Sequence, residues 1–205
     1  MSNNDDIILY NTEDKVKPQA PSIPTFDLVD PSWPVVNRVQ PEFDFSNPPT
    51  DPNAFASSLV ETAKKNNGLG LSANQCGYPY RVFVMGSEDN YIACFNPKIL
   101  TVSGEAHMPE SCLSFPLLIL NITRPKTIAV EYQDFNGETR TATFDGMTSR
   151  IFQHQLDILN GVLYTSRAKP LALKSGMKKV EKMYRKFFDP KMMKKIVNGN
   201  QKTTP

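Results

Sequence analysis

The sequence predicts an α+β domain in which antiparallel strands pack around a central buried helix. Two pairs of strand-like segments between residues 81 and 144 carry this prediction, together with a helical apolar stripe in residues 149–164 and an amphipathic segment near the C-terminus. The chain has 205 residues, 40% of them hydrophobic and 21% charged, which is typical of one globular domain.

We divide the chain into three parts. Residues 1–50 contain eight Pro and little periodicity, which predicts a Pro-rich extended N-terminal arm with one short strand at Ile7–Tyr10. The arm either wraps its own domain or reaches a neighbouring subunit. Residues 51–166 form the core, and residues 167–205 a basic C-terminal helix and tail.

The core begins with a helix. Asp51 and Pro52 are a typical N-cap and first helical residue, and apolar residues then recur at helical spacing up to Asn66. The glycine-rich stretch 68–77 lacks the Lys-Ser/Thr of a phosphate-binding loop, so its glycines indicate a close approach of the backbone to a ligand or another strand.

Two strand pairs follow. Residues 82–85 and 91–95 flank a polar turn, and residues 127–132 and 139–144 flank a second turn that contains Asn136-Gly137. Residues 108–116 lie between the pairs. They are bounded by two Pro, so we expect an irregular loop that carries chemistry.

Residues 149–164 are expected to form the buried helix, with Asn160-Gly161 as its end. Two His four residues apart on one helix face can hold a metal ion, with a Glu beside the first as general base. Here only the first His, His154, is present. Gln155 follows it, and Ile158 occupies the second His position.

Charge is unevenly distributed along the chain. Residues 1–166 hold 11 Lys and Arg against 19 Asp and Glu, whereas residues 167–205 hold 12 against 2. The last helix, expected from about Leu171 to Phe188, combines Lys with an apolar side that contains Leu173, Met177 and Val180. This balance favours an anionic partner over an ordinary solvated helix face.

Three segments together resemble the motifs of the peptide deformylase family: residues 68–75, 110–114 and 153–161. The resemblance covers about residues 50–165, and residues 67–75 and 108–116 are most similar to phage-encoded forms. The family removes the formyl group from the N-terminal methionine of new polypeptides, using Fe²⁺ or Zn²⁺ held by one Cys and two His.

The resemblance assigns roles residue by residue. It implies that Cys112 and His154 are at metal-ligand positions and that Gln155 is at the position of the general base. It also implies an oxyanion hole made by the Gln75 side chain and the Leu113 backbone N–H, and it places Gly70 at a substrate-facing position. Ser111 stands where the family usually has Gly.

The departures from the family pattern affect the chemistry itself. Ile158 has no atom that can bind a metal, and a Gln amide cannot accept a proton at neutral pH. Two other side chains, His107 and Asp157, are candidate replacement ligands, and neither is expected to complete a metal site. His107 is five residues before Cys112 in an extended segment, and Asp occupies the position of Asp157 in the intact motif without being a ligand.

We therefore expect a deformylase-like protein that has lost catalysis and serves as a binding or structural module, with no metal or a weakly bound one. The alternative is an active deformylase with a non-standard Fe²⁺ or Zn²⁺ site. The resemblance further implies a phage setting, with the ribosome as an anionic partner of the basic helix or phage structural proteins as partners of the arm. Three unpaired Cys, no long apolar run and no basic N-terminal leader predict a cytoplasmic protein, or one in the virion, without membrane contact.

Overall fold

The computed structural model describes residues 23–187. Five antiparallel strands form one sheet in the order β1-β2-β3-β6-β7, and β4 pairs with β5 in a separate two-stranded sheet. The elements in chain order are α1 (Pro52–Lys65), β1 (Gly70–Ser72), the 3₁₀ turn η1 (Ala73–Cys76), β2 (Val82–Ser87), β3 (Asn90–Ser103), β4 (Ala106–Cys112), β5 (Phe115–Arg124), β6 (Thr127–Gln133), β7 (Thr139–Asp145), α2 (Gly146–Leu159), the 3₁₀ turn η2 (Tyr164–Arg167) and α3 (Pro170–Phe187). The α+β prediction is confirmed.

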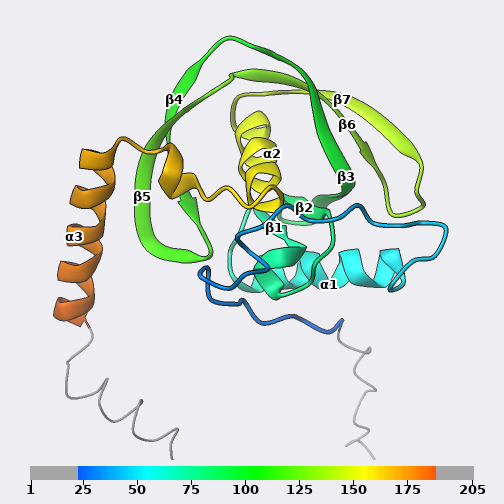
Figure 1. The fold of residues 1–205 in the computed structure, drawn as a ribbon, viewed down its shortest axis with the longest axis horizontal. Coiled ribbons are helices and arrows are strands. Elements are labelled where there is room, and N and C mark those ends of the chain that lie inside the picture. The colour runs from blue at the N-terminus through cyan, green and yellow to red at the C-terminus, as the bar shows by residue number, and fades with distance from the viewer. Residues whose placement is uncertain (1–22, 188–205) are drawn as a thin grey trace, which may run out of the picture.

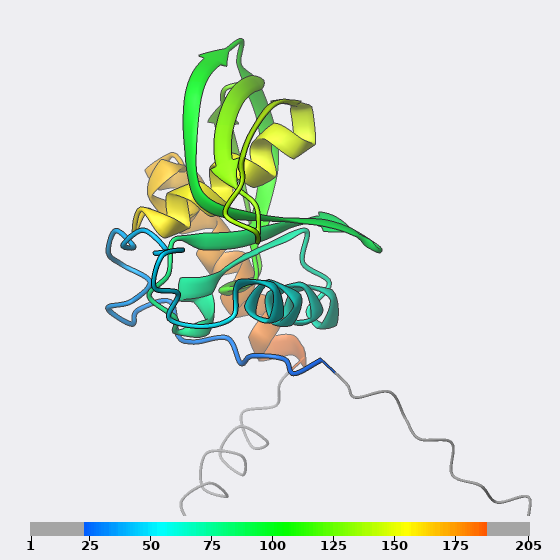
Figure 2. The ribbon, with the colours of Figure 1, turned by 90° about the vertical axis from the view of Figure 1, so that its right-hand side faces the viewer.

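Helix α2 is the centre of the fold. Figure 1 shows it enclosed by β3, β6 and β7 on one side and by the β4–β5 pair on the other, and Figure 2 shows the long strands rising beside it. Ten of its fourteen residues are buried. The predicted apolar stripe is confirmed, because Phe152 and Leu159 are fully buried against the sheet and Leu156 is 8% exposed.

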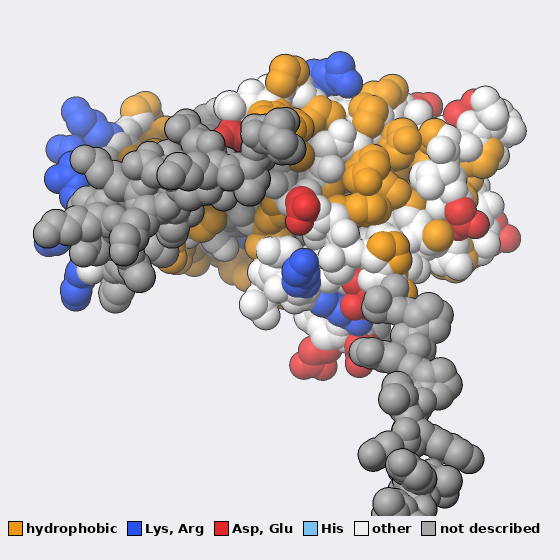
Figure 3. Space-filling model, turned by 90° about the horizontal axis from the view of Figure 1, so that it is seen from below, with side chains coloured by type: hydrophobic (Ala, Val, Ile, Leu, Met, Phe, Trp, Pro, Cys, Tyr) orange, Lys and Arg blue, Asp and Glu red, His pale blue; other side chains and the backbone are white. Residues whose placement is uncertain are grey.

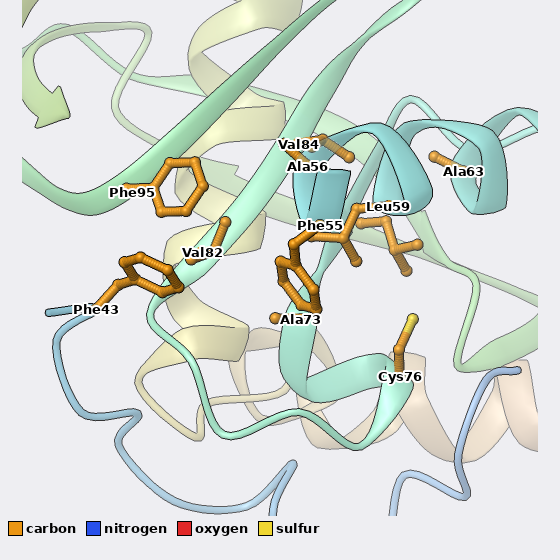
Figure 4. Close-up of a cluster of buried hydrophobic side chains, with 11 residues drawn as sticks. Phe43, Phe55, Ala56, Leu59, Ala63, Ala73, Cys76, Val82, Val84 and Phe95 are labelled. Carbon is orange, nitrogen blue, oxygen red and sulfur yellow. The ribbon is translucent and has the colours of Figure 1, made fainter. Parts of the chain in front are cut away.

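Helix α1 covers the opposite surface of β1 and β2. The Asp51 carboxylate accepts a hydrogen bond from the backbone N–H of Ala54 at 2.7 Å, as expected for the N-cap. Figure 4 shows the cluster under this helix, where Phe55 of α1 lies near Val82 of β2. Phe43 and Phe95 pack edge to face in the same cluster with their ring centroids 5.0 Å apart.

The described part of the arm, residues 23–50, lies on its own domain. Val36 and Phe43 are buried. The backbone N–H of Gln40 donates to the backbone carbonyl of Leu159 at 2.8 Å, so the arm provides a hydrogen-bond partner for a carbonyl at the end of α2. The strand predicted at Ile7–Tyr10 lies outside the described residues.

Gly161, just after the end of α2, lies close to the backbone of the arm. Its φ is +72°, and a Cβ placed on it would lie 2.7 Å from the backbone N of Arg38. Gly146, at the start of α2, has a similar φ of +55°, but a Cβ placed there would meet nothing within 4 Å. A side chain at Gly146 would therefore add backbone strain alone, whereas one at Gly161 would add strain and a steric clash.

We expect Gly161→Ala to lower the free energy of unfolding by about 3 kcal/mol or more, because left-handed strain of roughly 1–2 kcal/mol is added to a backbone clash. Gly146→Ala should cost only the strain, about 1–2 kcal/mol. Urea unfolding of both variants measures the difference. Equal losses would show that the contact between Arg38 and Gly161 yields at no cost.

The prediction of an irregular loop at residues 108–116 is wrong. Residues 106–112 form β4 and pair with β5, and Pro109 lies opposite Asn121 in the register. A two-stranded ribbon tolerates Pro because each strand has one edge that needs no hydrogen-bond donor. The alternating burial of Leu118, Leu120 and Ile122 is the strand pattern that the two Pro obscured.

Helix α3 stands at one side of the molecule beside β5 (Figure 1). Leu173 and Val180 of the predicted apolar side pack against the buried cluster that contains Leu118 and Leu120 of β5, but Met177 is 51% exposed. Gly176 takes the place of a large side chain at the contact, since a Cβ there would lie 2.9 Å from Leu118 Cδ1. Among the described helices, none is long and apolar enough to cross a membrane.

Candidate active site

A cavity of about 610 Å³ opens between the segment that leads into β1, the β4–β5 pair and α2. Gly70, Gln75, Cys112, Leu113, His154 and Gln155 all line it. The three motifs therefore meet at one place, although they lie far apart in the sequence. Of the residues assigned by resemblance, Ile158 is the one that does not line this cleft.

Gln75 is fixed by hydrogen bonds at both ends of its amide. Its Oε1 accepts from the backbone N–H of Ser72 at 3.0 Å, and its Nε2 donates to Ser114 Oγ at 2.9 Å. The same Nε2 lies 3.6 Å from Cys112 Sγ. The 3₁₀ turn thus presents an amide donor directly beside the thiol, next to Leu113.

Gln155 is held in the wall of the cleft by Ser72 and Gly70. Ser72 Oγ donates to Gln155 Oε1 at 2.7 Å. A Cβ on Gly70 would lie 2.8 Å from Gln155 Nε2, so the glycine gives the amide its space. The side chain is 4% exposed and neutral, so it offers hydrogen bonds without a group that takes up a proton.

Cys112, His154 and Glu110 lie in series at the floor of the cleft. His154 Nδ1 is 3.0 Å from Glu110 Oε2, and the ring and the Cys112 thiol line the same cavity. Burial opposes charge on the ring, but its bonds to Cys112 and Glu110 outweigh that effect and raise the pKa of His154 to about 9. Burial would raise the pKa of Cys112, yet the His154 and Ser114 contacts bring it below its ordinary value.

Glu110 is the anion of a buried network of charges. Arg124 Nε donates to Glu110 Oε1 at 2.6 Å, and Arg150 bonds to the same oxygen. Burial alone would raise the pKa of Glu110, but His154 and Arg124 lower it to about 2. Asp157 extends the network, with its Oδ2 2.6 Å from Arg124 Nη1.

Ile158 belongs to an apolar cluster behind the floor of the cleft. It is 1% exposed and packs in the group formed by Cys112, Leu118, Leu120, Ile122 and Tyr164. The side chain at the position of the family's second ligand therefore holds the β4–β5 pair against α2. This role is apolar packing, and it leaves no donor atom at that position.

The donor set does not fit the family's metal. A catalytic zinc site normally has three protein ligands, and this cleft offers the Cys112 thiol and the His154 ring. Asp157 is bound by Arg124 and by Arg167, whose Nη2 lies 2.5 Å from its Oδ1. His107 is exposed on β4 and contacts Thr123 Oγ1 at 3.0 Å. Over residues 23–187 no group of three or more His, Cys, Asp and Glu could hold an ion.

Sequence reasoning did not identify the residues that support the site. Arg124, Arg150 and Ser72 were not singled out, because their partners lie 14 to 83 residues away and give no local pattern. Tyr164 was also missed. Its hydroxyl donates to the Leu118 carbonyl at 2.8 Å, beside the His154 ring.

Known proteins share this sequence pattern. The polypeptide deformylase family model matches residues 30–174. The peptide deformylase of Thermotoga neapolitana is 42% identical over 113 residues, which are 55% of this chain and 69% of that protein. The peptide deformylase of Dictyoglomus thermophilum is 38% identical over 124 residues, which are 60% of this chain and 81% of that protein.

Solved structures agree with the sequence matches. A peptide deformylase from Synechococcus elongatus, in complex with actinonin, superposes with a TM-score of 0.71 at 29% identity, covering 76% of this chain and 86% of that one. The peptide deformylase from Thermotoga maritima superposes with a TM-score of 0.64 at 33% identity, covering 71% of this chain and 99% of that one.

Proposed function

This chain belongs to the peptide deformylase family, and from that premise we propose that it keeps a peptide-binding cleft but does not carry out metal-dependent hydrolysis. The observation that carries the proposal is Ile158, an apolar side chain packed where the family has a ligand. Gln155 adds to it, because the loss of a general acid–base group typically costs ~10²–10⁴-fold in rate. Metal binding is then absent or weak.

The cleft keeps groups that suit the end of a peptide. Gln75 Nε2 and the Leu113 N–H are the donors that the family uses for a carbonyl oxygen, and Met147 and Ile151 add apolar wall. A formyl-methionyl peptide matches this combination of one carbonyl and one apolar side chain. We therefore propose N-formylmethionyl or methionyl peptides as the ligand class.

We expect a formyl-methionyl tripeptide to bind to the purified protein in calorimetry, with formate release no faster than in buffer. Met147→Lys should weaken binding at least about tenfold, because a charge enters the apolar wall, whereas Met177→Lys on α3 should not. The two Met are similarly exposed, at 47% and 51%. Equal affinity of both variants and the wild type would contradict the proposed cleft.

A second candidate is active deformylation, and the relatives' names favour it, since the matched proteins are called peptide deformylase. Reconstitution with Fe²⁺ or Zn²⁺ under anaerobic conditions, followed by metal analysis and a formate assay, distinguishes the two. Metal at one ion per chain with formate release above buffer would establish the second candidate. Metal near zero with no release supports the first.

The basic face of α3 supports a further partner, and we propose the ribosome as the anionic surface it meets. In the described chain α3 carries exposed Lys174, Lys178, Lys179 and Lys182 against one acidic residue, Glu181. Figure 3 shows Lys and Arg gathered at the α3 end of the molecule. The proposed contact of the N-terminal arm with phage structural proteins, and the phage setting itself, stay predictions from the resemblance.

We expect ribosome co-sedimentation to weaken as salt rises from about 50 to 200 mM, because Lys–phosphate contacts release counterions. The triple variant Lys178→Glu, Lys179→Glu, Lys182→Glu should abolish it. Lys98→Glu with Lys126→Glu, at exposed positions on the strands, is the charge control. Unchanged co-sedimentation of the triple variant would show that α3 is not the contact with the ribosome.

A further inference from the structure

A groove of about 570 Å³ lies between β5 and α3, which stand beside each other in Figure 1. Its strand side carries two apolar side chains that are largely exposed, Leu117 at 52% and Ile119 at 64%. Its helix side is formed by Gly176, Lys179, Lys182, Met183 and Lys186. An exposed apolar surface with a charged rim is typical of a site that binds another chain segment.

Helix α3 approaches β5 closely and lines the groove with Lys side chains. A Cβ on Gly176 would lie 2.9 Å from Leu118 Cδ1, so the glycine allows the close approach. Lys179 and Lys182 follow at helical spacing and line the groove. Both are exposed, and within residues 23–187 neither has an ion-pair partner. The rim therefore offers positive charge to an anionic segment.

Leu117 lies where this groove meets the cleft, since it lines both cavities. Its φ is +68°, a conformation that residues other than Gly rarely adopt. The β4–β5 pair has a register shift between Glu110 and Cys112, and the facing part of β5, which contains Leu117, bulges. An apolar side chain is thus held partly in solvent on a strained backbone, and such strain is concentrated at binding and functional sites.

The chain itself contains a segment that matches the groove in charge and apolarity. Residues 1–14 hold two pairs of acidic residues, Asp5-Asp6 and Glu13-Asp14, and no Lys or Arg. The apolar run Ile7–Tyr10 lies between the two pairs. Residues 188–205 hold four Lys against one Asp, so the basic rim would repel them. Of the two segments outside the described chain, the N-terminal one therefore fits the groove.

The chain between Tyr10 and the first described residue, Ile23, is long enough to reach the groove. Thirteen residue steps at ~3.3 Å each span about 43 Å when extended. A domain of this size has a radius of gyration of about 15 Å and hence a diameter of roughly 40 Å. Figures 1 and 2 both show the start of the described arm and the C-terminal end of α3 on the lower side of the molecule, so the segment can follow this side.

We propose that residues 5–14 of this chain dock in the groove between β5 and α3. Their apolar run packs against Leu117 and Ile119, and their acidic residues pair with Lys179 and Lys182. A segment tethered to its own site has a high effective concentration, so a small contact area is sufficient. The docked segment would also compete with the ribosome for these two Lys, a consequence that rests on the proposed ribosome contact.

Carbodiimide cross-linking of the full-length protein tests the contact, because this zero-length reagent joins carboxylates to amines that touch them. An equimolar mixture of ¹⁵N-labelled and unlabelled protein is treated, and the linked peptides are identified by mass spectrometry. We expect residues 5–14 to link to Lys179 and Lys182 at least about tenfold more often than to Lys174 and Lys178, within one copy. The latter two Lys are exposed on the same helix but do not line the groove.

Two results of this experiment would overturn the proposal. Equal linking of all four Lys would show that the segment meets α3 without docking in the groove. Links between labelled and unlabelled protein would assign the groove to a second copy of the chain. The reaction needs neither a peptide ligand nor ribosomes, so failure of the proposed function leaves its result unaffected.

Matched variants test the apolar side of the groove. Ile119→Asp should lower the yield of links to Lys179 and Lys182 at least about tenfold, because a charge enters the apolar surface, whereas Val102→Asp should not. Val102 is 57% exposed on β3 and does not line the groove. Equal yields in these two variants would contradict docking on the β5 side.

Variants of the segment itself leave the described domain unchanged. Ile8→Ser with Leu9→Ser should lower the same yield at least about tenfold, because the apolar contact is lost while all four carboxylates stay. Val16→Ser, outside the apolar run, is the control and should keep the yield of the wild type. An unchanged yield in the double variant would overturn the proposal.

Discussion

The double variant Gln155→Glu, Ile158→His is expected to bind about one Fe²⁺ or Zn²⁺ per chain and to release formate from formyl-methionyl peptides at least ~100-fold faster than the wild type. The imidazole introduced at position 158 would be the third protein donor beside Cys112 and His154, which is the number that catalytic zinc sites normally have. The carboxylate introduced at position 155 would supply the proton acceptor that the Gln amide lacks. Metal analysis and a formate assay measure both results.

The single variants are the controls, because they separate metal binding, which depends on position 158, from proton transfer, which depends on position 155. Ile158→His alone should bind metal with little turnover, and Gln155→Glu alone should do neither. Stability gives a further readout: an imidazole in the apolar cluster of Leu118, Leu120 and Ile122 should cost roughly 1–3 kcal/mol without metal and regain it with metal. Metal binding by the double variant without turnover would mean that the cleft has changed beyond these two positions.

Glu110→Gln is expected to lower the free energy of unfolding by about 3–5 kcal/mol, although the substitution changes little in size or shape. The variant leaves two buried guanidinium groups, Arg124 and Arg150, without the anion that both contact. Asp157 compensates Arg124 in part, at 2.6 Å. Urea unfolding with a linear extrapolation measures the loss.

Glu131→Gln is the matched control for this substitution. Glu131 pairs with Lys98 at 2.7 Å on the sheet surface, where the Lys98 side chain is 60% exposed. Such pairs contribute roughly 0–1 kcal/mol, so little change is expected. A loss of similar size in both variants would show that the buried network is no more important to stability than one surface pair.

Local signals in the sequence predicted much of this fold correctly. The Asp51-Pro52 start of α1 and the Asn160-Gly161 end of α2 depend on neighbouring residues alone, and both are confirmed. The turn at Asn136-Gly137 is likewise local, and β6 and β7 flank it. The β4–β5 pair was missed because Pro109 and Pro116 interrupt a pattern that only the partner strand makes regular.

The candidate site also contains some residues that the sequence identified and others that it did not. Motif residues such as Gln75 and Cys112 could be identified from short sequence motifs, and the structure brings them together in one cleft. Their supports could not be identified, because ion pairs such as Glu110 with Arg150 join residues 40 positions apart. Sequence spacing also does not show that Ile158 packs in an apolar cluster, which is a property of the folded chain.

The contact between the N-terminal arm and the C-terminal end of α2 affects how the chain folds during synthesis. Residues 38–40 leave the ribosome early, yet their partners Leu159, Asn160 and Gly161 are made about 120 residues later. Contacts this distant in sequence require a large loop to close, which slows folding. Residues 38–40 must therefore wait for almost the last part of the core, and this part of the arm can dock only when α2 has been translated.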